Sequence, residues 1–214
     1  MKELYIIGAG DFGRETADTV HEINEAAPSF RIAGFIDDDE RMHGQCINGI
    51  EVVGGSESLF AIAERSDTRP CAVITIANPR IKRKVAEEFD GIVEWVNIIH
   101  PKAIIKRSAV VGCGNIIQHF SSVNSNAFVG DHCLINSNCV VGHDVRFGDC
   151  SSMMHFAGIM GDCIVENGVF IGANAVTVPR IRIGAGAVVG AGAVVLKDVE
   201  EGATVVGNPA RRVK

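Results

Sequence analysis

A six-residue repeat fills the second half of this 214-residue chain and constrains its fold more than any other feature. From Ile105 onward the sequence divides into sixteen hexads without an insertion, and fifteen of their first residues are apolar. The exception, Thr177, is still β-branched. A short fixed period predicts a solenoid, and a period of six is typical of a β-helix with three hexads in each triangular coil. Five coils at about 4.8 Å per strand would stand roughly 24 Å tall.

The fifth residue of most hexads is small, which suits a position close to a corner. Cys133, Cys139 and Cys163 hold this position, so we expect them to be interior packing residues. The chain has seven cysteines, no CxxC pair and no signal-peptide pattern at its start. These features predict reduced thiols in a cytoplasmic protein.

The N-terminal part has the pattern of a small α/β unit. An apolar run ends in the glycine turn 8–13, a helical pattern follows, and a second apolar run ends in Asp37 and Asp38. Such a turn presents backbone N–H groups at a helix N-terminus, where a phosphate binds, and Asp37 is placed to accept a ribose hydroxyl. The pattern fits a dinucleotide site, a shorter nucleotide-sugar pocket, or a tight turn that binds no ligand.

A further strand pattern leads into Asn78 and then into the start of a basic helix. In a doubly wound sheet this loop lies beside the first glycine turn, so Asn78 and Arg83 are candidates for the same ligand. For Lys82 and Lys84 a solvated face of the helix is an alternative with at least as much support as a ligand contact.

These patterns divide the chain into a Rossmann-like α/β domain at 1–103, an all-β helix at 104–200 and a tail at 201–214. The formal net charge is −6, whereas duplex-binding domains are basic, so we expect no nucleic-acid partner. No apolar run reaches the roughly 18 residues that a membrane-spanning helix needs, so we expect no membrane span.

His143 and Asp144 depart from the repeat at two positions that point out of the prism. A spacing of eighteen residues places Gly161 one coil above His143, which predicts a histidine beside an open notch. The carboxylate of Asp144 would orient the imidazole, and the imidazole would act as a general base toward an amine or hydroxyl. An ordinary surface histidine fits the same spacing.

A second column, also spaced by eighteen, becomes small and apolar toward its C-terminal end. Together with neighbouring glycines it predicts a groove for a thin chain such as pantetheine, although small residues also suit tight corners. The column consists of His119, Ser137, His155, Ala173 and Ala191.

Taken together, these segments resemble the hexapeptide-repeat sugar acetyltransferases with a left-handed β-helix. The resemblance is to the group of sialic-acid O-acetyltransferases and UDP-4-amino-sugar N-acetyltransferases, and it covers the whole chain. The segments that carry it are the glycine turn 8–13, Gly34–Asp38, Ile76–Asn78, Asn97–Pro101, Asn136 with His143-Asp144, and Gly207–Arg211. It implies a homotrimer that uses acetyl-CoA as co-substrate, needs no metal, and has its active site between subunits.

The resemblance also implies roles for individual residues. His143 would be the catalytic base, with Asp144 as its acidic neighbour. It also implies contacts for the acceptor, for acetyl-CoA and for the oxyanion. The sugar or nucleotide sugar would contact Gly10, Asp11, Phe12, Asp37, Asp38, Ala77, Asn78, Arg83 and Asn136. Acetyl-CoA would contact Ser152, His155, Gly161, Ala173, Gly190, Ala191 and Arg211, with Arg212 and Lys214 as further partners for its phosphates. A backbone N–H near Gly161 would meet the oxyanion.

The sequence departs from the family pattern at three places. Asp11-Phe12 replaces a frequent Gly-His, and an acid beside a phosphate turn would repel the ligand. Ser152 replaces a second histidine, and His155 is a candidate to take over its contact. Phe156 is a large residue where the family has a small one.

Three functions therefore compete. The first is acetyl transfer to a sugar amine or hydroxyl, and the second is binding of a nucleotide sugar without turnover. The third is NAD(P)-dependent oxidoreduction, against which the short first domain counts. The choice between amine and hydroxyl, the size of the acyl group and the acceptor sugar stay open.

Overall fold

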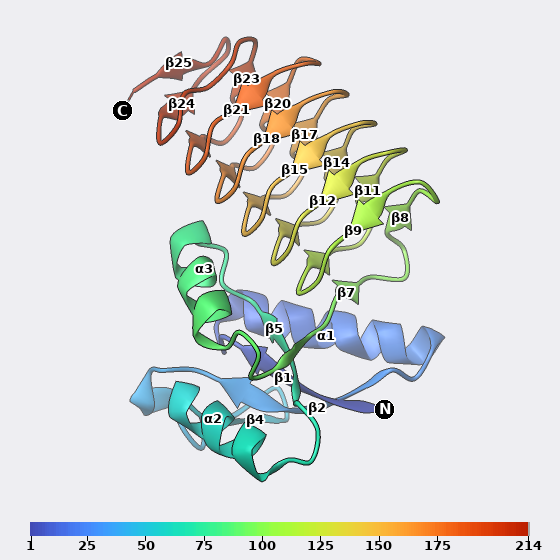
Figure 1. The fold of residues 1–214 in the computed structure, drawn as a ribbon, viewed down its shortest axis with the longest axis vertical. Helices are drawn as coiled ribbons and strands as arrows, with labels where there is room; N and C mark the ends of the chain where they lie inside the picture. Colours follow the sequence, from blue (N-terminus) through green and yellow to red (C-terminus); the bar gives the residue numbers. More distant parts are fainter. Residues whose placement is uncertain (214) are drawn as a thin grey trace.

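The computed structural model describes residues 1–213 and has two parts (Figure 1). The N-terminal part is a six-stranded sheet in the order β3-β4-β2-β1-β5-β6, in which only β3 runs antiparallel to its neighbour. Its strands are β1 (Lys2–Ile7), β2 (Phe30–Ile36), β3 (Cys46–Ile47), β4 (Ile50–Gly54), β5 (Cys71–Ile74) and β6 (Glu94–Trp95). Its helices are α1 (Asp11–Ala26), the 3-10 helix η1 (Glu40–Met42), α2 (Ser56–Arg65) and α3 (Pro79–Glu88).

The glycine turn between β1 and α1 is built as the sequence predicts. Gly8 has φ +107°, which side-chain-bearing residues rarely adopt. A Cβ on Gly13 would overlap the carbonyl oxygen of Gly8. Gly10 faces open space at the start of α1. The first two glycine features let helix and strand approach closely, and the third leaves the helix N-terminus accessible.

The C-terminal part is a triangular prism with three parallel sheets, which we call faces 1, 2 and 3 (Figure 1). Strands one coil apart pair with a shift of eighteen residues, as in Ile116 with Leu134. Face 1 contains β7 (Ile98–Ile99), β10 (Ile116–Ile117), β13 (Leu134–Ile135), β16 (Ser152–Met153), β19 (Phe170–Ile171), β22 (Val188–Val189), β24 (Thr204–Val206) and the antiparallel β25 (Arg211–Arg212). Face 2 contains β8 (Ile104–Ile105), β11 (Ser122–Val123), β14 (Val140–Val141), β17 (Gly158–Ile159), β20 (Val176–Thr177) and β23 (Val194–Val195). Face 3 contains β9 (Val110–Val111), β12 (Phe128–Val129), β15 (Arg146–Phe147), β18 (Ile164–Val165) and β21 (Arg182–Ile183).

The predicted fold class, a Rossmann-like α/β unit followed by a left-handed parallel β-helix, is confirmed. The stacking extends beyond the expected limits of 104 and 200. β7 already pairs with β10, and β24 in the tail pairs with β22.

The core of the prism consists of the first residues of the hexads and the small residues near the corners. Cys133, Cys139 and Cys163 are buried there, as expected. Thr177 also points inward, and its Oγ1 accepts a hydrogen bond from the backbone N–H of Met160 at 3.0 Å. That bond satisfies the one polar group among the sixteen first positions.

From Gly114 to Gly192 each corner turns through one residue with positive φ, and these residues recur every six positions. Asn, Asp and Gly are common among them because they tolerate the left-handed conformation. They include Gly114, Phe120, Asn126, His132, Asn138, Asp144, Cys150, Phe156, Asp162, Gly168, Asn174, Arg180, Gly186 and Gly192. Asp144 therefore has a backbone role in addition to any chemical one.

The N-terminal part packs on face 1. Outward residues Ile98, Ile116 and Leu134 of this face are buried in one cluster with Ala17 and Val20 of α1. Thr19 Oγ1 donates to Gln118 Oε1 at 2.8 Å across the same boundary. Faces 2 and 3 have no such cover within residues 1–213, since Ile104, Val110, Phe128, Val140 and Ile164 on them are exposed.

The solvated-face alternative is wrong for Lys82. Lys82 is 1% exposed, and its Nζ donates to Ser152 Oγ at 2.8 Å. Burial lowers the pKa of this lysine to about 8. The reason is that α3 covers face 1. The side of the helix that carries Lys82 therefore contacts the prism, whereas an isolated α/β unit would leave it in water. Lys84, in contrast, is exposed.

Candidate active site

His143 lies between β14 and β15, at the corner where face 2 meets face 3. Its side chain is 63% exposed. Gly161 lies directly over the ring, because a Cβ there would be 2.5 Å from His143 Cε1 and would overlap Nε2. The stacking expected from the spacing of eighteen residues is therefore present. The imidazole fits at this position because Gly161 has no side chain.

The carboxylate of Asp144 is bonded to this ring. His143 Nδ1 and Asp144 Oδ2 are 2.8 Å apart, and Asn126 Nδ2 donates to Asp144 Oδ1 at 3.1 Å. Hydrogen bonds from His143 and Asn126 hold the pKa of Asp144 below its ordinary value. An ionised carboxylate on Nδ1 fixes the tautomer and leaves Nε2 free to accept a proton.

Two further charged residues share this corner, and sequence reasoning missed them. Asp162 follows Asp144 by eighteen residues, and Arg180 follows Asp162 by eighteen. Arg180 Nε lies 3.7 Å from Asp162 Oδ2. His143, Asp144 and Asp162 each offer a ligand atom within 4.8 Å of the others, but all three are exposed and already have partners in the chain. The spacing of eighteen residues that places Gly161 over His143 also predicts these positions.

The glycine turn opens into a cavity of about 310 Å³. Gly8, Gly10, Asp37, Asp38, Ser56 and Thr75 are among the residues that line it. The cavity therefore unites the predicted phosphate turn with both predicted acids. Its size suits part of a nucleotide rather than a large ligand.

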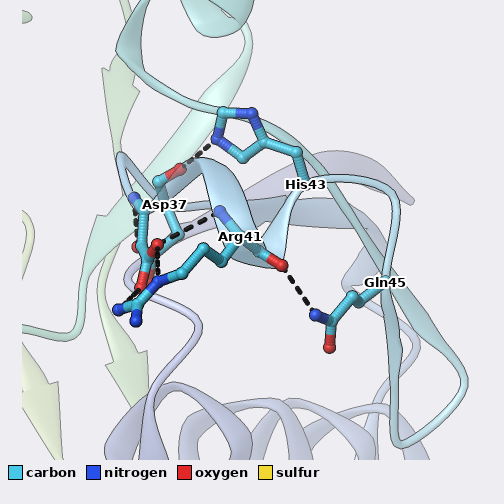
Figure 2. Close-up of polar contacts among 5 residues, drawn as sticks. Asp37, Arg41, His43 and Gln45 are labelled. Carbon is cyan, nitrogen blue, oxygen red and sulfur yellow. Dashed lines mark hydrogen bonds and ion pairs between the residues drawn. The ribbon is translucent and has the colours of Figure 1, made fainter.

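The oxygens of Asp37 are already used by the protein. Oδ2 accepts from Ala9 N at 2.9 Å and Oδ1 accepts from Asp39 N at 3.0 Å. Figure 2 shows the loop that follows, in which His43 Nε2 contacts the Asp37 carbonyl oxygen at 2.7 Å and Gln45 Nε2 donates to the Arg41 carbonyl at 2.7 Å. Asp37 thus braces the glycine turn, a role that spacing alone does not reveal.

Three neighbours of the turn also have local partners. Asp38 Oδ1 accepts from Ser56 N at 2.8 Å at the start of α2. Asp11 is 97% exposed and pairs with Arg14, which offsets its charge near the turn. Phe12 is half-buried against the cluster that joins α1 to face 1.

The loop after β5 does not bring Asn78 and Arg83 together on this cavity. Asn78 Oδ1 caps α3 by accepting from Arg80 N at 3.0 Å. Arg83 lies near Gly168 of the β-helix and lines a separate cavity of about 450 Å³ with Arg80 and Lys84. Of the residues of α3, Ile81 and Val85 line the glycine-turn cavity, whereas neither Asn78 nor Arg83 lines it.

The residues expected to bind acetyl-CoA lie in several places within one protomer. Ser152 is buried, receives the Lys82 ammonium and donates to the Ala77 carbonyl at 2.9 Å. His155 is exposed at the corner between faces 1 and 2. Ala173, Gly190 and Ala191 lie at this same corner. Gly161 belongs to the His143 corner instead.

The remaining expected contacts also lie apart from the His143 corner. Asn136 is buried on face 1, where its Oδ1 accepts from Ser137 N at 2.8 Å. Arg211 and Arg212 line a cavity of about 480 Å³ near the C-terminal end of the stack. Lys214 lies outside the described residues.

The two candidate sites, the glycine-turn cavity and the His143 corner, are not adjacent in one chain. The N-terminal part contacts face 1, whereas His143 is on the opposite corner of the same prism. The glycine-turn cavity and the His143 corner therefore lie on different sides of the prism within one chain.

Comparison with known proteins identifies both parts. The PglD N-terminal domain matches residues 3–89, and the bacterial transferase hexapeptide (six repeats) matches residues 162–197. GDP-perosamine N-acetyltransferase of Escherichia coli is 35% identical, over 98% of this chain and 95% of that protein.

Solved structures agree. PerB from Caulobacter crescentus, in complex with CoA and GDP-perosamine, is 26% identical with a TM-score of 0.91, covering 100% of this chain and 98% of that chain. The acetyltransferase domain of PglB from Neisseria gonorrhoeae is 26% identical with a TM-score of 0.86, covering 100% of both chains. The resemblance inferred from the sequence is thereby confirmed. The chain belongs to the family of hexapeptide-repeat sugar N-acetyltransferases that includes GDP-perosamine N-acetyltransferase.

Proposed function

We propose that this protein transfers an acetyl group from acetyl-CoA to an amine of a nucleotide-linked sugar, with His143 as general base. The observation that carries the proposal is the His143–Asp144 pair, which lies under Gly161 with Nε2 free at an exposed corner. The names of the similar proteins favour an amine over a hydroxyl, and CoA as co-substrate.

In the proposed reaction the neutral amine attacks the thioester carbonyl, and its nitrogen forms a bond to the acetyl carbon. His143 Nε2 takes a proton from the amine as this bond forms. The C–S bond then breaks, and the proton passes to the CoA thiolate. Asp144 stabilises the imidazolium that exists between the two proton transfers.

The tetrahedral oxyanion needs a hydrogen-bond donor close to His143. We assign this role to the backbone N–H of Gly161, which has no hydrogen-bond partner within residues 1–213. Backbone donors that are fixed before the reaction stabilise such an anion without reorganisation.

The nucleotide would occupy the cavity at the glycine turn, with its phosphates at the start of α1. We keep Gly10, Asp11, Phe12, Asp37 and Asp38 as its proposed contacts. For Asp37 the role is indirect, because its oxygens hold the turn. We retain 1–103, 104–200 and 201–214 as proposed domain limits, with β7 and β24 as strands from the neighbouring segments that add to the stack.

A homotrimer would complete the site. Faces 2 and 3 meet at His143, and both carry exposed apolar residues, among them Val140 at 38% and Ile164 at 40%. A second and a third copy packed on these faces would remove this surface from water. They would also bring residues from other corners, such as Ala173 and Ala191, to the His143 corner.

The proposed location is the cytoplasm. Seven cysteines are free, and five of them are buried, which suits a reducing compartment. No helix among residues 1–213 is long and apolar enough to cross a membrane.

The test is a panel of GDP-, UDP- and dTDP-linked amino sugars with acetyl-CoA, followed by release of free thiol. We expect turnover with at least one of them and its loss in His143→Asn, which removes the basic ring nitrogen but keeps a polar side chain. Binding of nucleotide sugars without thiol release would instead favour a non-catalytic protein. If His143→Asn kept its turnover, His143 would not be the general base.

A further inference from the structure

A column of polar side chains runs along the corner that carries His143. Asn126, Asp144, Asp162 and Arg180 follow one another at intervals of eighteen residues. All four have the left-handed backbone, with φ between 58° and 63°. Because the coils stack in register, the same backbone conformation at the same corner directs the side chains alike. Each residue can therefore contact the next one along the prism.

Asn126 reaches Asp144 from the preceding coil. Its Nδ2 donates to Asp144 Oδ1 at 3.1 Å, while Asp144 Oδ2 accepts from His143 Nδ1 at 2.8 Å. The two bonds occupy different oxygens of one carboxylate. Together they prevent the carboxylate from rotating about its terminal torsion, which is otherwise a soft motion. The orientation of the imidazole thus depends on a residue that does not touch it in the structure.

A second carboxylate makes this restraint necessary. Asp162 lies in the same group, with ligand atoms within 4.8 Å of those of His143 and Asp144. Arg180 pairs with Asp162 from the following coil at 3.7 Å. Asp162 is therefore attracted toward one end of the column, and Asp144 is held from the other. This arrangement keeps Nδ1 bonded to Asp144 and Nε2 available.

We propose that Asn126 is a positioning residue for acetyl transfer, which holds the Asp144 carboxylate so that His143 presents Nε2 to the acceptor. The inference rests on the function proposed above. It adds a residue seventeen positions before the base, on a different coil.

The backbone allows a clean test. Asn126→Gly removes the amide but keeps the left-handed conformation, which glycine adopts without strain. Asn138→Gly is the matched control, because Asn138 has φ 61° at the corner between faces 1 and 2. Asp144→Gly removes the carboxylate in the same way.

The first measurement needs no substrate. Nitrogen-15 NMR of the neutral His143 ring reports how much of it carries the proton on Nδ1. We expect this fraction to be high in the wild-type protein and in Asn138→Gly, lower in Asn126→Gly, and lowest in Asp144→Gly. An unchanged fraction in Asn126→Gly would overturn the inference.

The second measurement is a double-mutant cycle on turnover. We expect Asn126→Gly to lower kcat about tenfold, the effect of one hydrogen bond to a charged group, with the KM of acetyl-CoA unchanged. In the Asp144→Gly background the same substitution should change kcat less than about twofold, because Asn126 acts through Asp144. Equal losses in both backgrounds would show a merely structural role.

The two measurements separate the two proposals. A tautomer shift in a protein that never releases thiol would reject acetyl transfer while keeping the restraint on His143. Turnover that is insensitive to Asn126→Gly would reject the positioning role and keep the proposed function.

Discussion

The two parts of this protein use hydrogen bonds in different ways. From β7 to β23 of the β-helix, paired strands keep the same shift of eighteen residues, so residues that share a column lie on top of each other. In the N-terminal part each strand has its own length and register, and β1 and β2 even shift register within one pair. In the prism, the partner of a side chain can therefore be predicted from the sequence, since it lies eighteen residues away. In the α/β part the partners depend on loops whose paths follow no period.

The largest expected effect tests the stacking itself. Phe147 is fully buried at a first hexad position, and Phe147→Ala should lower the free energy of unfolding by about 4 kcal/mol, through lost burial and a cavity. Denaturant unfolding measures it. Phe156→Ala is the control, because Phe156 is 57% exposed and should change stability by less than about 0.5 kcal/mol. Similar losses of stability in both variants would contradict the conclusion that the first residue of each hexad points into the prism.

The next effect concerns the neighbour that the period predicts for His143. Gly161→Ala places a Cβ against the imidazole and should lower kcat/KM about 100-fold while the fold is kept. Steady-state kinetics and circular dichroism test both parts. Gly158→Ala in the same coil should be tolerated, since its Cβ meets the flexible end of Met160 at 3.2 Å and makes an ordinary contact with Val176 Cγ1 at 3.7 Å. A fully active Gly161→Ala protein would show that the ring does not need this space.

A smaller effect tests the boundary between the two parts. The buried Lys82 has its pKa lowered to about 8 from 10.5, so the folded chain binds fewer protons than the unfolded chain between these values. The contribution of Lys82 to stability should therefore rise with pH in this window, by on the order of 2 kcal/mol between about pH 8 and pH 10.

Buried cysteines change stability with pH in the opposite direction, so their contribution has to be cancelled in the measurement. Burial raises the pKa of Cys133 to about 12 and that of Cys139 to about 11, so the fold loses stability as unfolded thiols ionise above about pH 9. The difference in unfolding free energy between the wild type and Lys82→Met cancels this contribution. A difference that stays constant with pH would mean that the Lys82 ammonium is not buried in solution.

The smallest effect probes the aperiodic part. Asp37→Asn leaves only one carbonyl oxygen for the two N–H groups of Ala9 and Asp39. We expect the affinity for GDP or UDP to fall about fivefold, as the glycine turn loses one brace. Calorimetry with each nucleotide measures it, while binding of acetyl-CoA should not change. The exposed Asp18→Asn is the control, and an equal loss there would indicate a general charge effect.

The sequence predicts the fold well because the two halves carry strong patterns of different kinds. The six-residue period specifies the prism, its interior cysteines and the place of Gly161 over His143. The glycine turn and the following acids specify the α/β unit and bring Gly10, Asp37 and Asp38 to one cavity. The same spacing of eighteen residues also aligns Asn126, Asp162 and Arg180 with Asp144. Sequence reasoning missed them because polar residues at corners look like ordinary turn formers.

Other site residues could not be placed in this way. The spacing of α3 does not show that Lys82 faces a buried serine while Arg83 faces a different cavity. Nor does the position of Asp37 after β2 show that its oxygens are taken by the glycine turn.

What the sequence alone determined is everything that follows from repetition and backbone chemistry: the coils, the left-handed corners that favour Asn, Asp and Gly, and the residue above the histidine. Only the tertiary structure decided which face of the prism the N-terminal part covers. That choice depends on matching two surfaces far apart in the chain, such as Thr19 with Gln118 and Lys82 with Ser152. It buries a lysine and leaves the His143 corner open, because contacts between surfaces are set by shape and burial and not by any local period.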